Sequence, residues 1–202
     1  NKLKFGLVTF EPVPVMYFNP EIKNHRINNY EQKLYYLKKL NLDFIVIIKF
    51  NKSFSRIFAK DFIKDIIFNK LNANYIFVSK NFRFGKKRKG NIRILKEYED
   101  HYFFKTIITS PYKKNKKTIS SSLIRKKIKQ GKIIETRDLL GRNWSIEGKV
   151  VKGNQRGRKI GFPTCNIRLN DYVLPKLGVY AVLVENNLFK KKGIANIGFR
   201  PT

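Results

Sequence analysis

Apolar residues fall into two alternating patterns over the first 110 positions of the chain. Short runs rich in β-branched and aromatic residues predict strands at 5–10, 44–50, 75–78 and 102–110. Between them, apolar residues at helical spacing predict helices at 29–40, 58–71 and 92–101. Alternating strands and helices are typical of a parallel α/β sheet with crossover helices.

The pattern changes in the last third of the sequence. Helices are expected at 120–130, where serines form a capping start, and at 133–140. After Gly141, only short strands separated by Gly, Pro and Asn are expected, at 144–152, 167–169, 179–184 and 192–197. This all-β pattern is of the barrel or sandwich type. We therefore predict an α/β domain at 1–140 and an all-β domain at 141–202.

Composition and charge narrow the class of protein only slightly. The 202 residues contain one cysteine, which excludes an internal disulfide and fits a reducing compartment. No apolar run is long enough for a transmembrane helix, so we expect a cytoplasmic protein without a membrane partner. The net charge of +30 suggests a polyanion partner. However, lysines are scattered through every segment beside many Asn, Ile, Phe and Tyr residues, as A/T-rich codon usage would produce. We therefore predict no specific nucleic-acid partner.

The richest candidate site is the stretch 153–166, GNQRGRKIGFPTCN. Its glycines allow backbone N–H groups to approach a polyphosphate closely. Its arginines and lysine supply charge-assisted donors to phosphate oxygens. Thr164 and Asn166 offer hard oxygen ligands suited to Mg²⁺. On composition alone, an ordinary basic hairpin loop remains the alternative.

Three further segments lie where strands or helices begin and end in the α/β domain. Residues 8–12 (VTFEP) follow the first strand, and residues 79–85 (SKNFRFG) follow the third. Ligands of open α/β sheets bind at such strand ends, and aromatic rings beside an amide suit a flat heteroaromatic ligand. Residues 120–125 (SSSLIR) place hydroxyls and free N–H groups at a helix start, which is typical of an anion site. A plain strand exit, a packed loop and a simple helix cap are the respective structural alternatives.

Taken in order, these segments resemble the bacterial bifunctional riboflavin kinase/FAD synthetases. The glycine-rich stretch is similar to the family signature G-x-x-x-G-R-x-x-G-F-P-T-A-N, with Cys165 in place of alanine. The first domain carries sequences similar to the family's V-T-F-x-P-x-P, [DN]-F-x-F-G and S-S-x-x-I-R. Residues 137–142, 178–180 and 193–202 resemble its A-x-x-L-L-G-R, G-V-Y and G-x-A-N-I-G-x-R-P-T motifs.

The resemblance implies a fold and two reactions. It implies a Rossmann-like nucleotidyltransferase sheet in the first domain (FAD synthetase, or FMN adenylyltransferase) and a small antiparallel Greek-key β-barrel (riboflavin kinase) in the second. The barrel would phosphorylate riboflavin to FMN with ATP and Mg²⁺, and the first domain would adenylylate FMN to FAD. ATP, riboflavin and FMN are the implied partners. Oligomeric state stays open.

The resemblance also implies roles for individual residues. The implied nucleotide-binding residues are Gly153, Gly157, Arg158, Gly161, Phe162, Pro163, Thr164, Asn166, Ser121 and Arg125. Asn81, Phe82 and Phe84 would contact the flavin, and Thr164 and Asn166 would bind the metal. The side chain of Cys165, which lies between these two ligands, is expected to point into the barrel because side chains alternate along an extended chain.

Two family features are absent from these residues. The opening G-x-F-D-G-x-H-x-G-H segment is missing, and neither His25 nor His101 stands in its context. The family's catalytic Glu follows the R-P-T motif, beyond Thr202. We therefore assign no catalytic residue and expect the chain as given to be incomplete or inactive, and to make no FAD.

The rival hypothesis is a basic nucleic-acid-binding module in which an α/β domain is joined to a small β-barrel. Such a module needs aromatic residues interleaved with lysines on one barrel face. Trp144 and Phe162 are the candidates for those positions. Riboflavin fluorescence quenching that depends little on salt would separate the two hypotheses.

Overall fold

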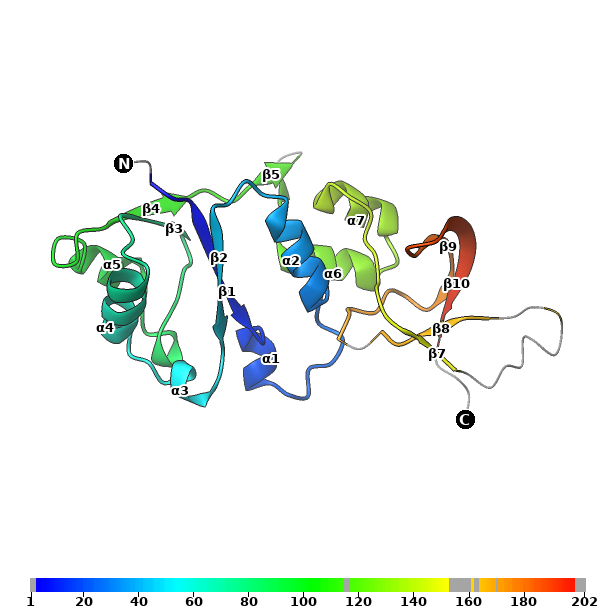
Figure 1. Ribbon diagram of the computed structural model, residues 1–202, viewed down its shortest axis with the longest axis horizontal. Coiled ribbons are helices and arrows are strands. Elements are labelled where there is room, and N and C mark those ends of the chain that lie inside the picture. The colour runs from blue at the N-terminus through cyan, green and yellow to red at the C-terminus, as the bar shows by residue number, and fades with distance from the viewer. Residues whose placement is uncertain (1–2, 115–116, 153–160, 162–163, 170, 199–202) are drawn as a thin grey trace. The chain divides into compact units, whose positions relative to one another are not determined.

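The computed structural model describes residues 3–114, 117–152, 161, 164–169 and 171–198 (Figure 1). The chain divides into two compact units. Unit 1 contains Asn1–Pro20 and Leu42–Thr118, and unit 2 contains Glu21–Asn41 and Ile119–Thr202. Unit 2 thus groups two segments of the predicted α/β domain with the C-terminal part of the chain. The domain division at residue 140 stays a prediction.

Unit 1 is built on two pairs of parallel strands, as the alternating pattern predicts. Strand β1 (Gly6–Glu11) pairs with β2 (Phe44–Lys49), and β3 (Tyr75–Ser79) pairs with β4 (Lys105–Thr109). A short antiparallel pair, β5 (Lys113–Lys114) and β6 (Lys117–Thr118), follows. All four strands predicted in this part of the sequence are therefore present.

The helices of unit 1 differ in detail from the predicted ones. They are α1 (Pro14–Phe18), α3 (Lys52–Ser55), α4 (Ala59–Asp61), the π-helix η1 (Phe62–Lys70), the 3₁₀ helix η2 (Lys86–Arg88) and α5 (Ile92–Glu97). Helix α1 begins at a proline, which needs no N–H partner in the first turn. The helix predicted at 92–101 ends at Glu97, and Phe103 takes a left-handed conformation (φ 54°) before β4 begins.

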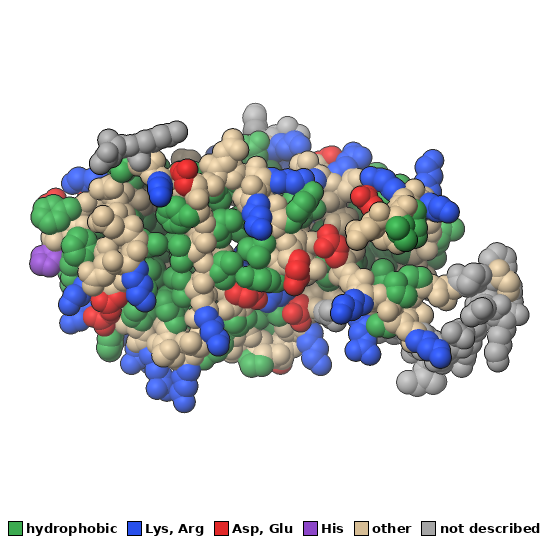
Figure 2. Space-filling view, viewed as in Figure 1, with side chains coloured by type: hydrophobic (Ala, Val, Ile, Leu, Met, Phe, Trp, Pro, Cys, Tyr) green, Lys and Arg blue, Asp and Glu red, His purple; other side chains and the backbone are tan. Residues whose placement is uncertain are grey.

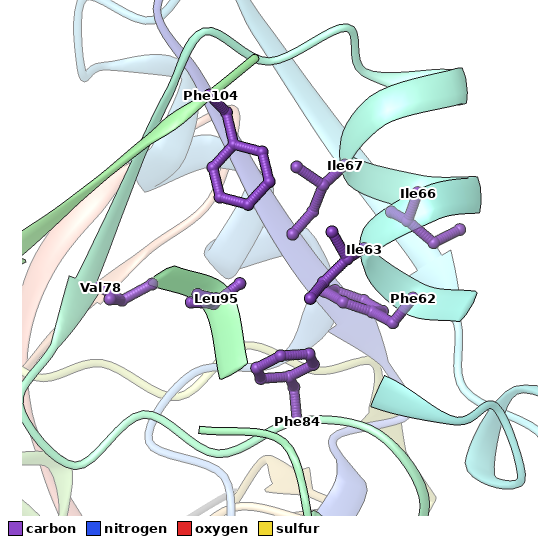
Figure 3. Close-up of a cluster of buried hydrophobic side chains, with 8 residues drawn as sticks. All are labelled: Phe62, Ile63, Ile66, Ile67, Val78, Phe84, Leu95 and Phe104. Atoms are coloured by element: carbon purple, nitrogen blue, oxygen red, sulfur yellow. The ribbon is translucent and has the colours of Figure 1, made fainter. Parts of the chain in front are cut away.

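The core of unit 1 lies where η1 packs against strand β3, helix α5 and the segments that contain Phe84 and Phe104 (Figure 3). Phe62, Ile63, Ile66 and Ile67 of η1 recur at a spacing that places them on one helix face. They pack with Val78, Phe84, Leu95 and Phe104. Burying one such side chain contributes about 1.5–3 kcal/mol, so this cluster positions β3 and the loop that follows it.

Unit 2 contains three helices and a smaller core. Helix α2 (Tyr30–Lys38) begins with a capping box between Asn29 and Gln32. Helix α6 (Ser121–Lys129) is capped by the Ser120 hydroxyl, and α7 (Ile133–Leu140) ends at Gly141, whose φ is 68°. The small core consists of Ile124, Ile128 and Val173.

The strands of unit 2 pair in an antiparallel manner, as an all-β pattern requires. Strand β7 (Val150–Val151) pairs with β8 (Asn166–Ile167), and β9 (Gly178–Glu185) pairs with β10 (Lys190–Ile197). The strand predicted at 144–152 is confirmed only for β7, because side chains at 144–147 bond instead to the segment around α2. Among the described residues, no helix is long and apolar enough to cross a bilayer.

Candidate functional site

The glycine-rich stretch is described only at its C-terminal end. Gly153, Gly157, Arg158, Phe162 and Pro163 lie outside the described residues. Gly161 has a φ of 82°, and an added Cβ would have no heavy atom within 4 Å. The glycine is therefore required by its left-handed backbone and not by a close neighbour.

The two proposed metal ligands lie at the start of β8. Thr164 is exposed, and Asn166 is half-buried and pairs with Val151 of β7. A hydroxyl and an amide oxygen are hard donors, which fit Mg²⁺ better than a soft metal. Within the described residues there is no group of three or more His, Cys, Asp or Glu side chains that could hold a metal.

The prediction for Cys165 is wrong, because its side chain is exposed instead of facing an interior. Strand β8 begins only at Asn166 and is two residues long. The alternation of side chains along a longer strand therefore gives no reliable direction at Cys165. A thiol between the two proposed ligands is open to solvent.

The proposed flavin-binding residues follow β3 but differ in exposure. Asn81 is exposed, whereas Phe84 is only 7% exposed and belongs to the core of unit 1. Phe82 stacks on Phe84, with ring centroids 5.4 Å apart and planes at 20°. The loop is pinned by backbone hydrogen bonds in both directions between Phe84 and Gly90. Phe84 thus has a packing role whether or not it also contacts a flavin.

The residues predicted to bind phosphate at the start of α6 differ in their contacts. Ser120, and not Ser121, accepts the capping hydrogen bond from the Leu123 amide. Ser121 is exposed. Arg125 Nε donates to the backbone oxygen of His25 at 2.8 Å, and burial lowers the pKa of Arg125. The remaining guanidinium nitrogens of Arg125 have no carboxylate partner within the described part of the chain.

A hollow of about 400 Å³ lies between His25 and one face of α6. Its lining residues are His25, Ser122, Arg125, Lys126, Lys129 and Gln130. We call it the basic hollow, because none of these side chains is acidic. Burial, followed by Arg125, Lys129 and Arg26, lowers the pKa of His25 below its ordinary value. The sequence analysis does not name His25, Lys126 or Lys129 as site residues. For the two lysines, the helical spacing of basic residues after Ser122 could have indicated a common face.

The segment that carries His25 is anchored on both sides. The Arg26 amide donates to the Asp171 carbonyl at 2.7 Å, and the Arg26 carbonyl accepts from the Val173 amide at 2.8 Å. The Trp144 indole N–H donates to the Ile27 carbonyl at 2.8 Å. These bonds fix the wall of the basic hollow opposite α6.

Comparison with known proteins decides the family. A family model described as FAD synthetase matches residues 1–123, and one described as riboflavin kinase matches residues 140–202. The chain belongs to the FAD synthetase family. The resemblance carried by the motifs, to bifunctional riboflavin kinase/FAD synthetases, is confirmed.

The curated relatives are longer than this chain. A bifunctional riboflavin kinase/FMN adenylyltransferase from Buchnera aphidicola subsp. Schizaphis graminum is 44% identical over 100% of the chain and 65% of its own length. The protein of that name from Escherichia coli K12 is 34% identical over 97% of the chain and 63% of its own length. The chain therefore spans slightly less than two thirds of these relatives.

A solved structure shares the fold of nearly the whole chain. It is described as a macrolide-efflux protein from Streptococcus pneumoniae, and it matches with a TM-score of 0.82 and 32% identity. The match covers 99% of this chain and 65% of that protein. The efflux description is a statement about that protein alone.

Proposed function

We propose that this chain is part of a bifunctional flavin enzyme that phosphorylates riboflavin to FMN and adenylylates FMN to FAD, using ATP for both steps. The observation that carries the proposal is the presence of two matches in one chain, FAD synthetase at 1–123 and riboflavin kinase at 140–202. The relatives that the chain matches carry both activities in the name of one protein, bifunctional riboflavin kinase/FMN adenylyltransferase. We also propose that the enzyme is cytoplasmic.

For the fold, we propose that the parallel pairs of unit 1 are parts of one Rossmann-like nucleotidyltransferase sheet. The antiparallel pairs of unit 2 are then parts of a Greek-key β-barrel. The parallel and antiparallel pairings support this division. The 0.82 TM-score to a solved structure at 32% identity supports it further.

In the kinase step, Thr164 and Asn166 would hold Mg²⁺ against the phosphates of the nucleotide. The metal, when bound, would neutralise charge on the transferred phosphoryl group. The glycines at 153, 157 and 161 would let the backbone close over the phosphates, and Arg158 would add a cationic donor. The exposure of Thr164 supports its access to a ligand.

In the adenylyl step, Ser121 and Arg125 would face the phosphates of ATP. Asn81 would hydrogen-bond the flavin or the nucleotide, while Phe82 would offer a ring edge or face. Transfer would join the FMN phosphate oxygen to the α-phosphorus of ATP and release pyrophosphate. Catalysis would then rest on positioning and charge neutralisation.

The test is product formation by the natural gene product that contains these residues. The purified protein is incubated with riboflavin, ATP and Mg²⁺, and the flavins are separated by chromatography. Formation of FMN and then FAD is expected. If neither appears, while riboflavin fluorescence is unchanged by the protein, the proposed function is wrong.

A further inference from the structure

One peptide group connects Arg125 to a segment far away in the sequence. The Nε of Arg125 donates to the His25 carbonyl oxygen at 2.8 Å. The His25 carbonyl and the Arg26 amide belong to the same planar peptide group. At the other end of this group, the Arg26 amide donates to the Asp171 carbonyl oxygen at 2.7 Å. The Asp171 carbonyl and the Arg125 guanidinium are therefore joined through two hydrogen bonds and one rigid plane.

Residues 171–173 hold Arg26 by more than this one bond. Arg26 forms a parallel β-bridge with Tyr172, and its carbonyl accepts from the Val173 amide at 2.8 Å. The Arg26 Nε lies 3.4 Å from an Asp171 carboxylate oxygen, and the Arg26 side chain is 13% exposed. We call residues 171–173 and these contacts the Arg26 clamp. The clamp fixes the peptide group whose carbonyl accepts from Arg125.

The clamp also packs against the helix that carries Arg125. Val173 is completely buried, and it packs with Ile124 and Ile128 of α6. The segment therefore contacts both the apolar face of α6 and the peptide group that holds the Arg125 side chain. A guanidinium is planar, so a bond at Nε restricts the directions in which its two Nη groups can donate to a phosphate.

We propose that the Arg26 clamp positions Arg125 for adenylyl transfer, although residues 171–173 lie in the segment that matches riboflavin kinase. The inference rests on the proposed function, in which Arg125 faces the phosphates of ATP. Asp171 is the positioning residue that it adds, because both its carbonyl and its carboxylate contact Arg26. Asp171 acts through Arg26 and His25 and does not itself contact the nucleotide.

The clamp should serve the FAD-forming step and not the kinase step. The proposed kinase ligands Thr164 and Asn166 lie at the start of β8, which pairs with β7. The Asp171 carboxylate is about half exposed, so its removal should not unfold the segment. A substitution at Asp171, within the kinase sequence, should therefore impair FAD formation and leave FMN formation intact.

The experiment compares two substitutions of Asp171 in the natural full-length protein. Alanine removes the acceptor near the Arg26 Nε, whereas asparagine keeps an oxygen at that place. Asp171→Ala is expected to lower kcat/KM for FAD formation from FMN about fivefold or more, mainly through a higher KM for ATP. Its FMN formation from riboflavin should stay within about twofold of wild type. Asp171→Asn should retain most of the FAD-forming activity.

Asp138→Ala is the matched control. It removes an exposed carboxylate from α7 in the same unit, away from the clamp, and should change neither activity. FMN formation also checks the folding of each variant, because Asp171 lies in the kinase segment.

A second measurement follows the position of Arg125 without any substrate. The exchange of its Nε–H proton with water is recorded by NMR, since the hydrogen bond to His25 protects this proton. Asp171→Ala should exchange at least about threefold faster than wild type, and Asp171→Asn and Asp138→Ala should remain close to wild type.

Several results would overturn the inference. Equal losses of FMN and FAD formation in Asp171→Ala would show an ordinary structural role. An unchanged rate of Nε–H exchange would show that the clamp does not hold Arg125. Faster exchange with normal FAD formation would show that this position is irrelevant to the reaction. If wild type forms neither flavin product, the proposed function fails and this inference fails with it. If wild type and Asp171→Ala both form FAD equally well, only this inference fails.

Discussion

The hydroxyl of Tyr172 donates a 2.7 Å hydrogen bond to the side-chain oxygen of Gln32, although 140 residues separate them in sequence. Both side chains are buried, with 2% and 1% exposure. Burial raises the pKa of Tyr172, so its phenol remains a donor. The Gln32 amide nitrogen donates to the Ser145 hydroxyl at 2.9 Å and to a Glu147 carboxylate oxygen at 3.1 Å. Gln32 therefore connects the start of α2 to two distant segments of unit 2.

Breaking this network should destabilise unit 2. Tyr172→Phe removes one hydroxyl and should lower the free energy of unfolding by about 1–2 kcal/mol. Gln32→Leu leaves several buried polar groups without partners and should cost about 3 kcal/mol. Urea denaturation, followed by the fluorescence of Trp144 in the same unit, measures both effects.

Tyr112→Phe is the matched control, because Tyr112 is 74% exposed and losing its hydroxyl should change stability little. The double variant should cost less than the sum of the two single changes, since both remove the same hydrogen bond. Strict additivity would contradict the direct coupling of Gln32 to Tyr172.

The regular elements could be predicted where local pattern decides them. The strands at 44–50 and 75–78 and the helix at 29–40 match β2, β3 and α2 closely, because their apolar spacing and caps are contained in the segments themselves. The first strand is also predicted, but the apolar pattern predicts no helix directly after it. Pro14 in fact starts α1. The π-helical form of η1 has no signature in the apolar spacing.

Tertiary grouping could not be predicted from local pattern. The inclusion of residues 21–41 in unit 2 depends on pairings such as Arg26 with Tyr172, which no short-range signal records. At the candidate site, the motifs predict which residue types are present, but they do not predict how far each side chain is exposed to solvent. They did not distinguish exposed Asn81 from buried Phe84, or show that Cys165 faces solvent.

Replacing Gly85 by alanine should destabilise the protein more than the same change at other glycines with positive φ. Its φ is 69°, and an added Cβ would lie 2.9 Å from the backbone nitrogen of Ala59. Gly141 has nearly the same φ, 68°, but nothing within 4 Å. Gly141→Ala should therefore cost only the left-handed conformation, about 1–2 kcal/mol. Gly85→Ala should cost more, about 3 kcal/mol, because backbone atoms must also move.

Hydrogen exchange measures the two glycine variants separately. The amide of Leu95, in the core of unit 1, reports Gly85→Ala, and that of Ile128, in the core of unit 2, reports Gly141→Ala. If the two variants lost equal hydrogen-exchange protection at these two amides, the close approach of Gly85 to Ala59 would have no effect on stability.

Thr164→Ala should reduce riboflavin kinase turnover by about 10²-fold or more, if the hydroxyl holds the metal and the phosphates. The residue is exposed, so its removal should not unfold unit 2. The measurement is FMN formation by the natural full-length protein, with circular dichroism as the check on folding. Turnover near the wild-type value would reject Thr164 as a ligand.

Cys165 should report nucleotide binding through its reactivity. Because the thiol is exposed, a maleimide or disulfide reagent should modify it readily in the free protein. Its neighbours Thr164 and Asn166 are the proposed ligands, so ATP with Mg²⁺ should slow the reaction several-fold by covering the thiol. Cys165→Ala should keep nucleotide affinity within about threefold, which is below ~1 kcal/mol. A labelling rate unchanged by saturating ATP and Mg²⁺ would place the nucleotide elsewhere.

His25 should make the stability of unit 2 depend on pH. Its pKa in the folded protein lies below the ordinary value of 6.5, first because of burial and then because of Arg125, Lys129 and Arg26. The unfolded chain therefore binds more protons than the folded protein in this range. The stabilising contribution is complete above pH 6.5 and is lost as the pH falls toward the lowered folded pKa.

His25→Gln removes this contribution but keeps the backbone oxygen that accepts from Arg125. Between about pH 7.5 and pH 5, wild type should lose more thermal stability than His25→Gln. Parallel curves for wild type and His25→Gln would show that the imidazole titrates alike in both states.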